Sequence, residues 1–138
     1  RLRHPALRTV GVTTLAQALR TSPGTADAWA DLGGGYLTLG DHKAAFEAFE
    51  RALGLEPRRV LIREEHAYAG AGANLVQKAI DSLEVAVGLR PDFAVGLGLL
   101  GNLLCQAGRC KDAIPVLAQA ERASPTESSG PRRGWPPS

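Results

Sequence analysis

Apolar residues recur at intervals of three and four along most of the chain, which is the spacing of one face of an α-helix. Within residues 26–39 this stripe consists of Trp29, Leu32, Tyr36 and Leu39. Gly40 and Asp41 then interrupt the pattern, as is typical where one helix ends and the next begins. The following stripe consists of Ala45, Phe49, Ala52 and Leu53. It stops before Pro57, which cannot continue a helix, so the pattern predicts two helices joined by a tight turn.

This arrangement returns along the chain with a period of 34 residues. Four columns of similar residues keep the interval. They are Pro23, Pro57, Pro91 and Pro125; Ala18, Ala52, Ala86 and Ala120; Leu15, Phe49, Leu83 and Leu117; and Gly11, Ala45, Ala79 and Ala113. Four columns in one register predict a chain built of helix-turn-helix units. The small residues would let the two helices of a unit approach closely, while the large column fills the space between them.

Residues 26–59 resemble the tetratricopeptide repeat family. The matching residues are Trp29, Leu32, Gly33, Tyr36, Gly40, Asp41, Ala45, Phe49, Ala52 and Pro57. Residues 94–127 also match, at Leu97, Leu100, Gly101, Leu104, Gly108, Ala113, Leu117, Ala120 and Pro125. Between them only a second helix matches, because Arg63, His66 and Gly70 stand at the tryptophan, leucine and tyrosine places. The resemblance covers roughly nine-tenths of the chain.

The resemblance implies an all-α fold, a right-handed α-solenoid (α-α superhelix) of helix-turn-helix repeats. Residues 1–25 are predicted to be a partial repeat, the second helix of a preceding unit. Complete repeats are predicted at 26–59, at 60–93 with a degenerate first helix, and at 94–125. Residues 126–138 are rich in proline, serine and glycine, and this composition predicts a disordered tail.

Charge and composition exclude several classes of function. The whole chain carries a net charge of +2, but positions 10–125 hold 11 basic and 13 acidic residues, so this central part is slightly acidic. Such a balance argues against a nucleic-acid partner. No apolar run reaches the ~18 residues that a membrane span requires, and no signal segment stands near Arg1. The absence of methionine suggests a fragment or processed form, and two cysteines favour a reducing compartment, the cytoplasm.

One short pattern invites an enzymatic interpretation. Gly96, Gly98 and Gly101 form G-x-G-x-x-G, the fingerprint of a dinucleotide-binding loop, and Glu121 lies twenty residues further on. That loop requires a strand before the glycines and a second strand ending at the acidic residue. Here Gly101 falls on the repeat's glycine column and Glu121 lies within a predicted helix, so the match is accidental. No cofactor is expected.

The candidate reactive residues also have simpler explanations. Cys105 and Cys110 flank the turn at Gly108 without further ligands nearby, so we expect two ordinary buried thiols in preference to a disulfide across the turn. His66 belongs to no metal-binding motif and is expected on a partly buried helix face. The hypothesis that follows is that the middle helix pair loosens below about pH 6. The sequence therefore predicts no catalytic residue and no metal site.

Glycine is unusually frequent in the predicted first helices. Beyond the glycine column, these residues are Gly34, Gly35, Gly70, Gly72, Gly96 and Gly98. Each would cost roughly 1 kcal/mol relative to alanine at an exposed helical site. Two explanations remain open. The array is weakly stable, degenerate or truncated, or the small residues admit the backbone of a ligand.

In the tetratricopeptide repeat family the first helices line a concave groove that binds peptides. The resemblance assigns a peptide groove to Ala30, Gly34, Leu37, Leu61, Glu64, Tyr68, Val95, Gly98, Asn102 and Gln106. One subclass clamps the terminal carboxylate of chaperone peptides. At the matching places this chain has Ala30, Gly34, Glu65, Val95 and Leu99. None of these donates to a carboxylate, so a chaperone clamp is not expected.

The resemblance therefore implies a non-catalytic protein-protein interaction module, a scaffold that binds a peptide or helix of a partner protein. The alternative is a substrate-presenting region of a larger enzyme, for example a glycosyltransferase, whose catalytic domain lies outside this chain. The last unit has no helix after it to cover its apolar face, and this predicts end-to-end self-association. Trp135 in the tail is a further candidate for a short docking motif, although a solvated tail is the favoured interpretation.

Overall fold

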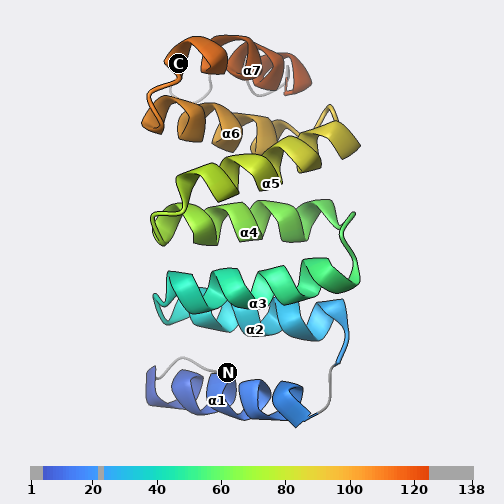
Figure 1. The fold of residues 1–138 in the computed structure, drawn as a ribbon, viewed down its shortest axis with the longest axis vertical. Coiled ribbons are helices and arrows are strands. Elements are labelled where there is room, and N and C mark those ends of the chain that lie inside the picture. The colour runs from blue at the N-terminus through green and yellow to red at the C-terminus, as the bar shows by residue number, and fades with distance from the viewer. Residues whose placement is uncertain (1–4, 22–23, 125–138) are drawn as a thin grey trace, which may run out of the picture.

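The structure is a computed structural model that describes residues 5–21 and 24–124. Seven α-helices occur in these ranges, stacked in chain order along the long axis of the molecule with α1 and α7 at opposite ends (Figure 1). They are α1 (Pro5–Thr21), α2 (Ala26–Thr38), α3 (His42–Leu55), α4 (Val60–Gly72), α5 (Val76–Leu89), α6 (Ala94–Gln106) and α7 (Cys110–Ala123). The described residues contain no strand. The predicted all-α repeat solenoid is confirmed.

The turns α2–α3, α4–α5 and α6–α7 share one backbone geometry. In each turn a single residue adopts a left-handed conformation, with φ of +83° at Gly40, +64° at Asn74 and +80° at Gly108. In each, the amide of the following residue donates to a carbonyl five positions earlier, at distances of 2.7 to 2.9 Å. Glycine and asparagine adopt this conformation most readily, which explains how the middle turn forms without a glycine. Each turn returns the chain antiparallel to the helix before it.

Two kinds of apolar residue bury the helices against one another. Phe49 and Leu83 are fully buried, and the ring of Phe49 lies against Gly33 of the partner helix α2. Phe46 and Ile80 are also buried, and they lie under the next helix pair. Phe46, for example, stacks on the His66 ring of α4 with 4.2 Å between ring centroids. The core is therefore continuous from one helix pair to the next, as expected for a solenoid.

The structure separates the glycines of the first helices into two groups. A Cβ atom at Gly33, Gly35 or Gly70 would lie 2.7 to 3.1 Å from a side chain of a neighbouring helix. Gly72, Gly96 and Gly101 are similarly closed, by His42, Phe93 and Leu117 respectively. At Gly34 and Gly98, in contrast, no atom lies within 4 Å of that position. Half of the glycine excess (Gly35, Gly70 and Gly72) thus reflects close helix packing, Gly96 is closed by Phe93 just before its own helix, and two of the first-helix glycines are open.

His66 occupies the place of a core leucine and forms a buried polar pair with Ser82 of α5. Its Nδ1 lies 2.9 Å from Ser82 Oγ, which itself donates to the carbonyl of Arg63 at 3.3 Å. This arrangement places the proton on Nδ1. Nε2 has no hydrogen-bond partner among the described residues, and Glu50 Oε2 lies 3.6 Å away. Burial, and after it the positive charges of Arg63 and Lys78, lower the pKa of His66 to about 4.

Substitution of two adjacent glycines by alanine should have opposite effects on stability. Gly34→Ala adds a methyl group into open space and should raise the free energy of unfolding by about 0.5–1 kcal/mol. Gly33→Ala places a Cβ 2.7 Å from the ring of fully buried Phe49 and should lower it by about 1–3 kcal/mol. Urea unfolding followed by circular dichroism measures both. Changes of the same sign would contradict this packing.

The His66 site should make the protein less stable in mild acid. The unfolded chain binds a proton on His66 below pH 6.5, whereas the folded protein does so only near pH 4. Stability should therefore be constant above pH 6.5 with respect to this group. As the pH falls from 6.5 towards 4, it should decrease by up to about 1.4 kcal/mol per pH unit.

The His66→Leu variant is the matched comparison, because it restores an apolar residue and removes this titration while leaving every carboxylate in place. Free energies of unfolding should be measured for both proteins at pH 7.5, 6, 5 and 4.5. The difference between them should grow in the variant's favour as the pH is lowered. Parallel pH profiles would show that His66 does not contribute.

Candidate functional site

The ten residues predicted to form a groove lie on α2, α4 and α6, the first helices of the three helix pairs. They are Ala30, Gly34 and Leu37 on α2; Leu61, Glu64 and Tyr68 on α4; and Val95, Gly98, Asn102 and Gln106 on α6. On each helix they are spaced by three or four residues, so they share one face of that helix. We call this set the first-helix face.

Three large apolar side chains on the first-helix face are open to solvent. Leu61, Tyr68 and Val95 are 60%, 56% and 61% exposed. Their sequence neighbours Ile62 and Leu97 are buried in the core, as the helical period requires. A single exposed leucine or valine is ordinary on a protein surface, whereas here three large apolar side chains are exposed on two successive first helices.

The remaining positions of the face differ in how much they offer a ligand. Asn102 and Gln106 are exposed, and each carries an amide that both donates and accepts hydrogen bonds. Ala30 and Leu37 are half-buried and pack against the core of the first helix pair. Gly34 and Gly98 have open space above the backbone. Only α6 among these three helices carries all three kinds of position, with exposed Val95, the two amides and the open backbone at Gly98.

Acidic residues give one part of this surface a negative potential. Burial, and then the charges of Glu64 and Asp31, raise the pKa of Glu65. Asp27, at the start of α2, is instead neutralised by Arg59, whose guanidinium lies 2.7 Å from its carboxylate. Hydrogen bonds to Glu56 and Asp27 raise the pKa of Arg59. The surface around Asp31, Glu64 and Glu65 therefore favours a basic group on any partner.

The described residues do not suggest metal or membrane chemistry. In residues 5–21 and 24–124, no three histidine, cysteine, aspartate or glutamate side chains come together in a way that could hold a metal ion. No helix in this part of the chain combines the length and the apolar character needed to cross a membrane.

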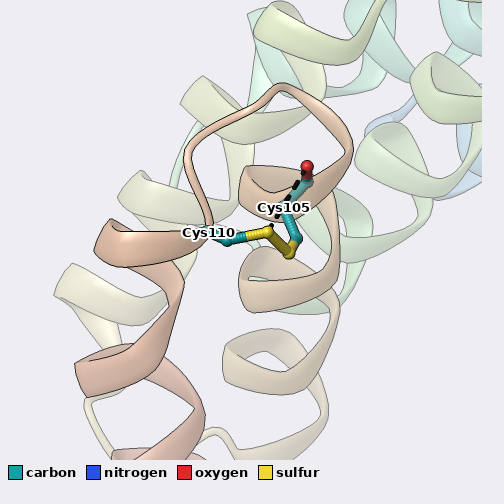
Figure 2. The surroundings of a disulfide bond; sticks show 2 residues. All are labelled: Cys105 and Cys110. Carbon is teal, nitrogen blue, oxygen red and sulfur yellow. Dashed lines mark hydrogen bonds between the residues drawn. A yellow bond between two sulfur atoms is a disulfide. The ribbon is translucent and has the colours of Figure 1, made fainter.

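The two cysteines form a disulfide, so the prediction of two buried thiols is wrong. Figure 2 shows the bond between Cys105, in the last turn of α6, and Cys110, at the start of α7. Both residues are exposed. The tight turn at Gly108 brings them together, because it folds α7 back onto the end of α6.

Two hollows on other parts of the surface were not predicted from the sequence. One, of about 240 Å³, lies beside His66 and is lined by Glu50, Arg63, Lys78 and Asp81, together with Ser82 and Val85. The other, of about 440 Å³, lies between α1 and α3 and includes Trp29, whose ring carries the Arg51 guanidinium 5.1 Å from its centroid. Opposite charges are mixed in the first hollow, so it has no clear preference for a charged ligand.

Comparison with known proteins agrees with this architecture. A family model described as tetratricopeptide repeat matches this chain twice, at residues 9–60 and at residues 35–94, and the two matches overlap. Among curated proteins no sequence matches the chain.

Solved structures give further support for the fold. The crystal structure of MamA is 18% identical, with a TM-score of 0.80 over 89% of this chain and 72% of that chain. The structure MamA MSR-1 C2 is 20% identical, with a TM-score of 0.78 over 87% of this chain and 69% of that chain. The MamA RS-1 ArsTM double mutant is also 20% identical, with a TM-score of 0.79 over 88% and 68%. At these identities the likeness concerns the fold alone.

The family matches together span residues 9–94, more than half of the 138-residue chain. The helix pairs α2–α3, α4–α5 and α6–α7 repeat one architecture, with the same turn geometry and a buried alanine column at Ala45, Ala79 and Ala113. This chain belongs to the tetratricopeptide repeat family.

Proposed function

We propose that the chain is a non-catalytic interaction module whose first-helix face binds a helix or an extended segment of another protein. The observation that carries this proposal is the row of solvent-exposed Leu61, Tyr68 and Val95, accompanied by the open backbone at Gly34 and Gly98. Repeat proteins bind their partners along such extended surfaces because stacked units present equivalent positions side by side.

Each part of the face contributes a different interaction. Full burial of an exposed leucine or valine side chain contributes at most about 1.5–3 kcal/mol, and a tyrosine supplies a large contact area with little loss of conformational entropy. The amides of Asn102 and Gln106 can pair with the backbone of a bound segment. Glu64 and Glu65 would attract a basic residue in the partner. The partner expected from this chemistry is an apolar segment with a lysine or arginine beside it.

The predicted division of the chain follows from the same proposal. We take residues 26–59, 60–93 and 94–125 as three repeats, each contributing its first helix to the face. Residues 1–25, which contain α1, would contribute the second helix of a preceding repeat. The predicted tail at 126–138 lies outside the described residues.

The proposal is tested by a quantitative pull-down from a cell lysate with the wild type and two variants. Gly34→Arg/Tyr68→Glu places charge on the first-helix face at two positions that are not needed for the core. Val85→Glu is the matched control, because Val85 is a 42% exposed apolar residue on a second helix, α5. Circular dichroism should show that all three proteins are equally helical.

Binding at the face should reduce the amount of bound partner at least tenfold in the double variant and leave it unchanged in the control. A partner identified in this way should then be retained by wild type with an affinity that falls as salt is added, because acidic residues border the face. Equal retention by both variants would place recognition elsewhere, and equal loss would show that the substitutions act through the fold.

A further inference from the structure

The disulfide between Cys105 and Cys110 is not required to form the turn that it spans. Neither of the other two turns has cysteine at the equivalent places, which hold Leu37 and His42 in α2–α3 and Ala71 and Val76 in α4–α5. Those turns nevertheless close with the same left-handed residue and the same amide-to-carbonyl hydrogen bond as this one. The backbone therefore sets the turn, and the disulfide adds a covalent bond to it.

Apolar packing also holds α6 and α7 together independently of the sulfur atoms. Leu100 and Leu104 of α6 and Ala113 of α7 belong to one buried cluster, and half-buried Val116 packs against it. Breaking the disulfide should therefore leave the two helices paired. Because the turn keeps the two cysteines close, the bond can form again in an intramolecular step.

Both cysteines are exposed, so a thiol in solution can reach the bond between them (Figure 2). Cys110 is the first residue of α7, where unpaired backbone amides favour negative charge on its sulfur, and nearby Asp112 is paired with Arg109 at 3.1 Å. Cys105 lies in the last turn of α6, where unpaired carbonyl groups have the opposite effect. The carbonyl oxygen of Cys105 lies 3.8 Å from Cys110 Sγ, but a thiol is only a weak donor. Cys110 is therefore the better leaving group.

We propose that Cys105 and Cys110 form a reversible thiol-exchange site for low-molecular-weight thiols and their disulfides. The thiolate of such a compound attacks Cys105 Sγ, the bond between the two cysteine sulfurs breaks, and its electron pair leaves with Cys110 as a thiolate. A second thiolate attacks the sulfur that the first compound contributed to the mixed disulfide, and Cys105 leaves as a thiolate.

The exchange balances without any further reactant. Two thiols are oxidised to one low-molecular-weight disulfide, the protein disulfide is reduced, and the two protons that the thiols release are taken up by the cysteine thiolates. An excess of the low-molecular-weight disulfide reverses the reaction. This inference does not depend on the first-helix face, because neither Cys105 nor Cys110 belongs to it.

Reduced glutathione added to the full chain under native conditions tests the proposal. Free thiols are alkylated at successive times and the products are analysed by mass spectrometry. Because the disulfide is exposed, its rate of reduction in native buffer should lie within about tenfold of the rate in concentrated urea. Circular dichroism should show that the reduced protein keeps its helices, and oxidised glutathione should then restore the intramolecular bond.

Single and double variants test the order of the two steps. Trypsin cleaves after Arg109 and separates the two cysteines, and the glutathione adduct trapped during reduction of the wild type should lie on the Cys105 peptide. In Cys110→Ser, oxidised glutathione should leave a stable adduct on Cys105, because no second thiol can displace it. The double variant Cys105→Ser/Cys110→Ser should be as helical as the wild type and should form no adduct.

Four results would overturn the proposal. They are reduction that proceeds only in urea, loss of helical structure in the reduced protein or the double variant, disulfide-linked dimers in place of the intramolecular bond, and a trapped adduct on Cys110.

Discussion

Close approach of the two helices in each pair is the constraint on which this structure depends. It is possible because a small residue stands where the two helices cross: Gly33 faces the ring of Phe49, Gly101 faces Leu117, and Ala67 holds this place in the middle pair. At Gly33 the absence of a Cβ lets the ring of Phe49 fill the gap, and Phe49 is fully removed from water. Tight pairs then bury a second row, Phe46 and Ile80, under the following pair. The solenoid is built from these two kinds of contact, one within each helix pair and one between successive pairs.

The middle pair shows how much departure from the pattern this architecture tolerates. His66 stands where a leucine is usual, and the fold accommodates it by pairing Nδ1 with Ser82 and stacking the ring on Phe46. Nε2 has no hydrogen-bond partner within the described residues, so the free-energy cost of burying the histidine ring is only partly compensated. A buried histidine held neutral in this way gives one repeat a titratable group in its core, where the equivalent places of the neighbouring repeats hold buried Leu32 and Leu100.

The first-helix face follows directly from repetition. Residues on the first helices that are not needed for packing recur at equivalent positions, which gives the first-helix face its exposed apolar side chains. Such a surface suits a partner that lies along the solenoid.

The sequence by itself determined the helices, their pairing and the family, because a 34-residue period combined with helical spacing leaves few alternatives. It did not distinguish the open glycines from the closed ones, because Gly33 and Gly34 look alike until Phe49 lies 2.7 Å from the Cβ position of only one. It also failed to predict the disulfide, which depends on how closely one turn returns the chain. Local periodicity depends on residues that are close in the sequence, whereas distances between side chains on different helices are fixed only when the helices pack.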